Sequence, residues 1–162
     1  MIRTYLVNLM KQYHEYFHLS FGLIAYLVTL SIFPGADMTT TLFLAVIASF
    51  LPDFDHLLAV YFYARSTAYS TAIRSHLNRY DLPGAIEHIR RHHKSNHFIL
   101  SHNLLTPTVF SFLFIFFVKR DSPEVSVFCL SFALHFVFDV IEDLLTLGRL
   151  NPNWYLDFKR EN

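Results

Sequence analysis

The residues of this sequence that could do chemistry are histidines and aspartates placed inside or beside long apolar stretches. His135 and Asp139 lie four positions apart, so on a helix they project from one face. Imidazole together with carboxylate suits Zn²⁺, Mn²⁺ or Fe²⁺. An aspartate deep in a membrane helix costs about 2.5–3.5 kcal/mol on insertion scales, so several are tolerated only where they pair, bind metal or line a wet cavity. We therefore predict a metal site held by a subset of His18, Asp53, Asp55, His56, His97, His102, His135 and Asp139.

Four apolar segments must position these groups. They run from about Phe17 to Phe33, from Met38 to Leu51 with an extension past Pro52 to Tyr63 left open, from Phe98 to Val118, and from Val125 to about Ile141. A helix rises 1.5 Å per residue, so a hydrocarbon core of about 30 Å takes about 20 residues. Only the third segment reaches that length unaided, and the others need flanking polar residues or the extension. The sequence predicts an all-α integral membrane bundle of about four transmembrane helices.

Composition supports this class. Of 162 residues, 53% are hydrophobic and 16% charged, which is too apolar to cover a small soluble domain. The net charge of zero argues against specific nucleic-acid binding. The single Cys129 can form neither an internal disulfide nor a thiolate zinc site, and it is expected to be ordinary packing. We find no removable signal peptide and expect one membrane-embedded domain over residues 1–162.

The polar stretch from Ala64 to Asn96 separates the second apolar segment from the third. It carries six Lys or Arg residues against two acidic ones, and the Pro83-Gly84 pair is expected to break it into two helices. The positive-inside rule makes this helical loop cytoplasmic, with both termini inside, and puts the chain in the cytoplasmic (inner) membrane. Residues 1–16 read as an amphipathic helix on the inner surface, with Ile2, Leu6, Leu9 and Tyr13 along one side.

Span polarity brings the eight candidate ligands to one membrane level. Odd spans run outward and even spans return, so the beginnings of the first and third share a side with the ends of the second and fourth. All eight groups therefore lie near the cytoplasmic face. The alternative for any single histidine is an interfacial side chain bonded to backbone or lipid headgroups.

Several further groups lie close to the predicted site. Glu142 and Asp143 continue the face of Asp139 and could serve as a general base or an outer partner, or could be interfacial carboxylates. The loop histidines His88, His92 and His93 are expected to be solvated. Gly22, four residues after His18, would permit close helix approach.

The sequence His14-Glu15-Tyr16-Phe17-His18 matches H-E-x-x-H, the zincin signature. In that interpretation His14 and His18 bind Zn²⁺ and Glu15 activates water, as in an intramembrane protease. This reading leaves the other His and Asp elements unexplained. Glu15 could equally serve a different hydrolase as an acid or base.

The order of these motifs resembles the LexA-regulated, membrane-bound metal-dependent hydrolase family. Residues 51–56 match its LPDxDH element, residues 97–103 keep both histidines of HRGxTHS, His135 and Asp139 match a later His-x-x-x-Asp, and His18 with Gly22 matches its early His and small residue. The resemblance covers about residues 18–155. It implies a helical membrane fold and metal-dependent hydrolysis, with distant similarity to zinc-dependent phospholipase C and P1 nuclease. The family's Arg-Gly after the first His is Phe98-Ile99 here.

These observations together predict a membrane-bound hydrolase of a phosphate ester, with a membrane lipid as the accessible substrate. One to three divalent ions, Zn²⁺ before Mn²⁺ or Fe²⁺, would activate water. Asp55 or Asp53 would bridge two ions, and Asp55, Glu15 and Glu142 are the candidate catalytic carboxylates. The alternatives are the H-E-x-x-H protease and a noncatalytic metal-binding or transport protein. The sequence does not indicate an oligomeric state.

Overall fold

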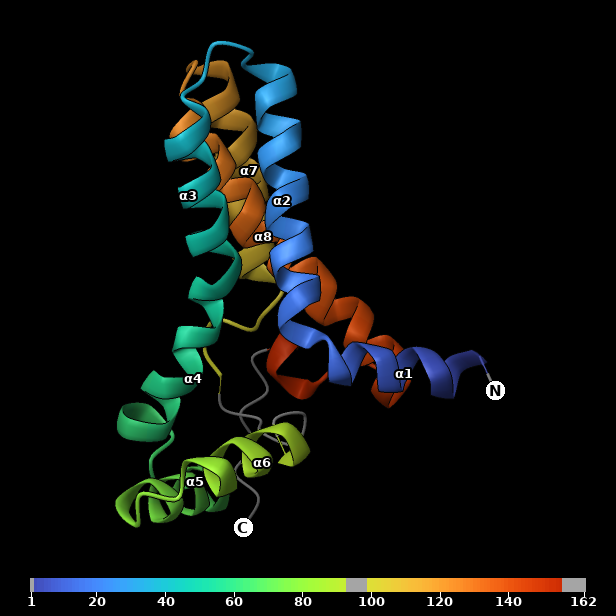
Figure 1. Cartoon of the computed structure of the whole chain (residues 1–162), viewed down its shortest axis with the longest axis vertical. Coiled ribbons are helices and arrows are strands. Elements are labelled where there is room, and N and C mark those ends of the chain that lie inside the picture. The colour runs from blue at the N-terminus through green and yellow to red at the C-terminus, as the bar shows by residue number, and fades with distance from the viewer. Residues whose placement is uncertain (1, 93–98, 156–162) are drawn as a thin grey trace. The chain divides into compact units, whose positions relative to one another are not determined.

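The computed structural model describes residues 2–92 and 99–155, and in these ranges it contains helices and connecting turns but no strand. The all-α prediction is confirmed. The chain forms two compact units (Figure 1). The first comprises Met1–Pro52 and Leu104–Leu150, and the second comprises Asp53–Asn103 and Asn151–Asn162. The expectation of a single domain stays a prediction.

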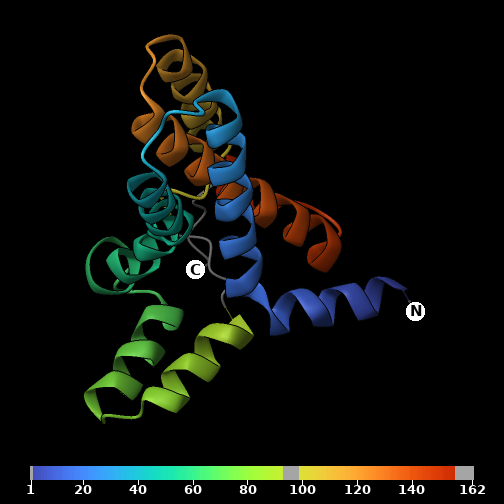
Figure 2. The ribbon, with the colours of Figure 1, turned by 45° about the horizontal axis from the view of Figure 1, so that its top comes forward.

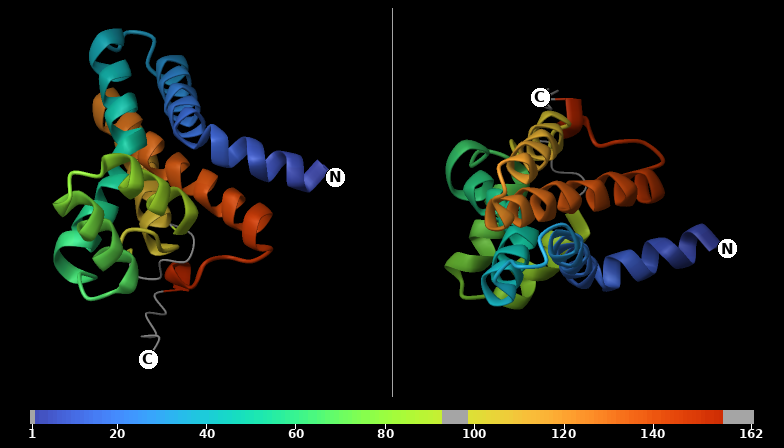
Figure 3. Two further views of the ribbon diagram at one scale, coloured as in Figure 1. Left: turned by 60° about the horizontal axis from the view of Figure 1, so that its bottom comes forward. Right: turned by 90° about the horizontal axis from the view of Figure 1, so that it is seen from above.

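The first unit is a helical bundle built around one long helix. Helix α8 (Pro123–Leu147) packs against α2 (His14–Ile32), α3 (Met38–Phe50) and α7 (Leu105–Lys119), and α2 also packs against α3. Figure 3 shows α8 crossing the bundle when it is seen from above. The helix starts after Ser122 with a proline in its first turn and ends at Gly148, whose positive φ of 73° terminates the helix.

Within residues 2–92 and 99–155, three helical stretches are long and apolar enough to cross a membrane: His14–Ile32, Met38–Tyr63 and Pro123–Leu147, with 19, 26 and 25 residues. The extension of the second segment past Pro52 is confirmed, with a 3-10 turn, η1 (Leu51–Asp53), at the proline. The first and last helices are longer than the apolar segments suggested, because polar residues at their ends remain helical. The apolar helix α7, with 15 residues, is shorter than these three.

The prediction for the third segment was wrong in its starting point. Helix α7 begins at Leu105, and the preceding residues from Ile99 form bends. Their backbone groups are bonded elsewhere. The amide of Ser101 donates to Asp55 Oδ2 at 2.6 Å, and Asn103 Nδ2 donates to the Leu100 carbonyl at 2.6 Å. Side chains that take the backbone hydrogen bonds compete with the helix, which therefore starts later.

The N-terminal helix also ends earlier than predicted. Helix α1 covers Ile2–Gln12 and packs against α8 and α2, and α2 starts at His14. Met10 is buried, and Arg3 Nε donates to the Leu145 carbonyl at 2.9 Å. Along the predicted apolar side of this helix, Ile2 and Leu6 are exposed and Leu9 is half-buried.

Small residues allow α2 and α3 to approach closely. A Cβ atom at Gly22 would lie 2.9 Å from Ser49 Cβ and 3.0 Å from the Ala45 carbonyl oxygen. Ala25 and Ala45 are fully buried in the same seam with Val127 of α8. The close approach expected at Gly22 is therefore present, as is usual where membrane helices associate through small residues.

The second unit carries a helical hairpin (Figure 2). The short helix α4 (Phe54–Leu58) continues into a π-helical turn, η2 (Ala59–Tyr63). Helix α5 (Ala68–Asn78) packs against η2 and against α6 (Leu82–His92), and a 3-10 turn, η4 (Pro152–Tyr155), lies near the C-terminus.

The two helices predicted for the polar stretch are present, but the break is not at Pro83-Gly84. It falls at Arg79–Asp81, and Pro83 lies in the first turn of α6, where its missing N–H is not needed. Asp81 caps that turn. Its Oδ1 accepts from the Gly84 amide at 2.9 Å, and its Oδ2 lies 2.7 Å from His76 Nδ1.

This cap predicts a pH dependence of the hairpin. The hydrogen bond from the Gly84 amide, aided by His76, holds the pKa of Asp81 below its ordinary value of 3.8. Since the folded pKa is lower than the unfolded one, the ionised carboxylate stabilises the hairpin above pH 3.8, and this contribution is lost as the pH falls through the folded pKa. In detergent-solubilised protein, we expect the Gly84 amide NMR shift to titrate with a midpoint below 3.8. A midpoint at or above that value would contradict the cap, and Asp81→Asn should abolish the transition.

Candidate metal centre

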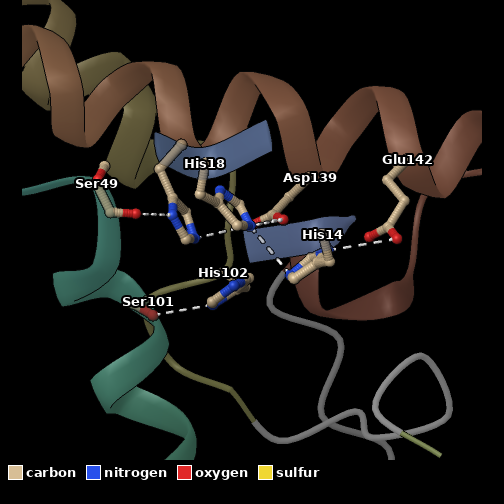
Figure 4. A network of polar contacts seen from close by, with 8 residues as sticks. His14, His18, Ser49, Ser101, His102, Asp139 and Glu142 are labelled. Carbon is tan, nitrogen blue, oxygen red and sulfur yellow. Dashed lines mark hydrogen bonds and ion pairs between the residues drawn. The ribbon is translucent and has the colours of Figure 1, made fainter. Parts of the chain in front are cut away.

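Three predicted ligands meet in the first unit. His18 of α2 and His135 and Asp139 of α8 each offer one ligand atom, and these atoms lie within 4.8 Å of one another (Figure 4). All three residues are buried, and the two imidazole rings stack with centroids 3.8 Å apart. The helical spacing of His135 and Asp139 places them on one face, as predicted, and α2 supplies the third ligand.

The protonation of His135 is set by a backbone carbonyl. His135 Nδ1 lies 2.8 Å from the Ser49 carbonyl oxygen, and since a carbonyl only accepts, Nδ1 must carry the proton. Ser49 is in the last turn of α3, directly before the 3-10 turn at Pro52. The lone pair of neutral His135 is then on Nε2, 3.2 Å from Asp139 Oδ2. Two electron-rich atoms at this distance repel unless a proton or a cation lies between them.

The distances fit a divalent cation. Metal–nitrogen and metal–oxygen bonds of about 2.0–2.2 Å put neighbouring ligands of a tetrahedral site about 3.3–3.5 Å apart. His18 Nε2 lies 3.6 Å from Asp139 Oδ1, and His135 Nε2 lies 3.2 Å from Asp139 Oδ2. An imidazole whose second nitrogen donates to a carbonyl is the usual metal-bound arrangement, because that bond fixes the tautomer and the ring orientation.

His14 joins this cluster, although the sequence assigned it only to the protease alternative. His14 Nε2 lies 3.0 Å from His18 Nε2, and His14 Nδ1 lies 3.5 Å from Glu142 Oε1 (Figure 4). His14, Asp139 and Glu142 form a second group whose ligand atoms are within 4.8 Å of one another. The i,i+4 spacing of His14 and His18 could have indicated that both belong to one site. Hydropathy, however, places the start of the apolar segment at Phe17, which leaves His14 outside it.

The candidate acid–base carboxylates differ in burial. Glu142 is only 1% exposed and contacts His14, whereas Glu15 is on the exposed surface of α2. Asp143 is buried on α8 beside Glu142. The catalytic roles of Glu15, Glu142 and Asp55 stay predictions.

The second unit holds another part of the predicted set. Asp55 Oδ1 accepts from the Tyr63 hydroxyl at 2.7 Å and Oδ2 from the Ser101 amide at 2.6 Å, so this carboxylate ties the bend after Ile99 to α4 and η2. The rings of His56 and His102 are 5.0 Å apart. His102 Nδ1 also lies 3.0 Å from Ser101 Oγ (Figure 4).

The other polar residues that the sequence singled out in the second unit are not all within the described residues. Asp53 is half-buried at the end of η1. His97 and His93 lie outside the described residues, while His88 and His92 lie on α6, with His92 exposed. The convergence of the ligands of both units on one site, and its position near the cytoplasmic face, stay predictions.

Comparison with known proteins gives a family. No curated protein and no solved structure shows a significant match to the chain. The family model described as YdjM inner membrane protein matches residues 15–148, which include the buried histidines and carboxylates of α8 and His18 of α2. With most of its length matched, and with three helices able to span a bilayer, this chain belongs to the YdjM inner membrane protein family.

Proposed function

We propose that the protein is a membrane-embedded metal-dependent hydrolase whose divalent cation is held by His18, His135 and Asp139. The observation that carries this proposal is the facing of His135 Nε2 and Asp139 Oδ2 at 3.2 Å, with the His135 tautomer fixed by the Ser49 carbonyl. Because both residues are buried between helices that can span a membrane, the repulsion of these two atoms is costly unless a proton or a cation lies between them. A Zn²⁺, Mn²⁺ or Fe²⁺ ion bound between these two atoms would replace their repulsion by two metal–ligand bonds.

A divalent cation bound there would activate water and polarise a phosphoryl oxygen. The chain's own residues would do the rest. Glu142, one helical turn after Asp139, is the candidate proton acceptor for the attacking water. His14, 3.5 Å from Glu142 and 3.0 Å from His18, would orient that carboxylate and hold a proton after it leaves the water.

We further propose a phosphate ester as the substrate, with a membrane lipid as its source. In such a reaction the oxygen of water bonds to phosphorus while Glu142 accepts the proton that the water loses. The ester P–O bond breaks, and the leaving alkoxide takes that proton from Glu142. A lipid reaches a site between membrane helices by lateral diffusion, which favours it over a soluble ester. Asp53, Asp55, His56, His97 and His102 stay predicted ligands, and Asp55 stays the predicted bridge, but this proposal does not depend on them.

The test is hydrolysis of phospholipid phosphate esters by the full chain purified in detergent, with and without added Zn²⁺ or Mn²⁺. We expect metal-dependent release of product, a loss of about 10²–10⁴-fold in kcat in Glu142→Gln, and a clearly smaller loss in Glu15→Gln, whose carboxylate is on the exposed surface of α2. Activity that survives exhaustive chelation would sink the metal-dependent proposal. Equal activity of the Glu142→Gln variant would remove Glu142 from the mechanism.

One observation favours a second candidate, the intramembrane zinc protease. His14 Nε2 and His18 Nε2 are 3.0 Å apart, and Asp139 lies within reach of both histidines, as a third ligand of an H-E-x-x-H site would. This candidate requires Glu15 as the base. It predicts the reverse pattern, in which Glu15→Gln abolishes cleavage of a membrane peptide while Glu142→Gln retains it.

A further inference from the structure

Three arginines of the second unit line one surface groove. Arg65, Arg74 and Arg79 share it with Thr71, Ser75 and Asn78, and its volume is about 530 Å³. The lining thus combines three permanent positive charges with neutral hydrogen-bonding side chains and contains no carboxylate. Such a surface is complementary to an anion.

The helix geometry explains why these groups converge. Thr71, Arg74 and Asn78 are at i, i+3 and i+7 of α5, so they follow one side of that helix. Arg74 Nη2 donates to the Arg65 carbonyl at 2.5 Å, and this bond joins the backbone two residues after η2 to α5. Arginine offers a planar fork of donors that matches phosphate oxygens in pairs, unlike the point charge of lysine.

The start of the groove is tied to a candidate membrane span. Arg65 comes two residues after Tyr63, where the stretch Met38–Tyr63 ends. Tyr61 and Phe62 just before it are 47% and 71% exposed. Aromatic side chains at the end of a span are typical of the headgroup level of a bilayer. The covalent connection therefore keeps Arg65 near that level.

Helix α6, the second helix of the hairpin, has the residue pattern of a helix at the headgroup level of a bilayer. Leu82, Ile86 and Ile89 are exposed at i, i+4 and i+7 of α6, while Ala85 is buried. Tyr80, in the turn before α6, is 93% exposed. An amphipathic helix with an exposed apolar stripe and basic residues such as Arg90 is typical of a helix that lies in a membrane interface.

We propose that the groove of Arg65, Arg74 and Arg79 binds the phosphate headgroup of an anionic phospholipid. The hairpin would lie at the membrane surface, with its exposed apolar residues in the interface. This inference goes beyond the proposed hydrolysis and requires neither the metal nor catalysis. The ligand is a lipid headgroup and not a free phosphate, because the groove begins directly after a membrane span and shares its hairpin with the exposed apolar stripe.

The test is native mass spectrometry of the full chain in nonionic detergent, titrated with dioleoyl phosphatidic acid or dioleoyl phosphatidylcholine. We expect retention of phosphatidic acid in preference to phosphatidylcholine. Arg65→Gln and Arg79→Gln should each weaken retention about fivefold, the effect of one basic residue at an anionic membrane surface. Arg120→Gln is the matched control, because Arg120 is exposed at the end of α7, outside the groove and the hairpin, and it should leave retention unchanged.

Two further arms separate a site from diffuse attraction and from free phosphate. Arg65→Lys keeps the charge but loses the paired donors, so it should also weaken retention. Binding of phosphatidic acid by Arg65→Lys with wild-type affinity, or equal weakening by Arg120→Gln, would overturn the groove as the site. Displacement of the lipid by equimolar inorganic phosphate would overturn the lipid assignment. The monodisperse elution and thermal midpoint of each variant exclude misfolding as the cause.

Discussion

Replacing Asp139 by Asn is expected to lower the affinity of the full chain for Zn²⁺ by at least about 100-fold. Loss of a partner that only orients a ligand already costs 10–100-fold, and Asp139 belongs to both groups of candidate ligands in the first unit. Asparagine keeps the shape of the side chain but removes the charge that neutralises the cation. His18→Ala should have an effect of similar size, because it removes the ligand that α2 contributes.

Isothermal titration of the detergent-purified protein and elemental analysis after dialysis would measure the affinity and the stoichiometry. Asp121→Asn is the matched control, since Asp121 is exposed and its positive φ of 54° suits asparagine. In wild-type protein, Zn²⁺ at about 100 times its Kd should add about 2.7 kcal/mol of stability, and this gain should vanish in Asp139→Asn. Wild-type stoichiometry in both Asp139→Asn and His18→Ala would refute the site.

Substitution of Gly22 by Leu is expected to destabilise the bundle by about 3 kcal/mol or more. A Cβ there meets the Ala45 carbonyl oxygen at 3.0 Å, and a backbone atom cannot rotate away. Even Gly22→Ala should be destabilising or neutral, because an overpacking cost of about 1–3 kcal/mol outweighs or cancels the roughly 1 kcal/mol that alanine gains over glycine in a helix.

Gly35→Ala supplies the comparison, since a Cβ at Gly35 meets nothing within 4 Å. Thermal midpoints in detergent should fall for Gly22→Leu and stay constant for Gly35→Ala, with about 2–4 °C expected per kcal/mol for a chain of this size. Gly22→Leu should also weaken metal binding. A leucine at this position would push α2 away from α3 and so separate His18 from His135, whose ring is hydrogen-bonded to the Ser49 carbonyl of α3. An unchanged midpoint in Gly22→Leu would show that this seam is loosely packed.

The sequence was informative where one physical effect dominated. Apolar length predicted a span beginning at Met38 and one over Val125 to about Ile141, which in the structure are the helical stretches Met38–Tyr63 and Pro123–Leu147. The cost of buried charge predicted the pairing of His135 with Asp139. It was misleading where a distant partner decided the local structure. The start of α7 at Leu105 depends on Asp55 taking the Ser101 amide, and no local pattern near residue 101 contains that information.

The candidate site shows the same division. His18 could be assigned from its place at the start of an apolar segment, whereas His14 was placed outside that segment because hydropathy falls before Phe17. In the structure α2 continues to His14, and the resulting i,i+4 pair reaches Glu142. The hairpin break was misplaced for a related reason: proline and glycine mark helix starts as well as helix ends, and only the Asp81 cap identifies which applies.

The end of α3 has a consequence for the chemistry of the candidate metal centre. Regular α-helix stops at Phe50, before the 3-10 turn at Pro52, and the carbonyl of Ser49 in this last turn accepts from His135. The partner of His135 Nδ1 is thus a backbone atom and not a side chain. A substitution that changes only the side chain of Ser49 should therefore leave this hydrogen bond, and the Nδ1 proton that it requires, in place.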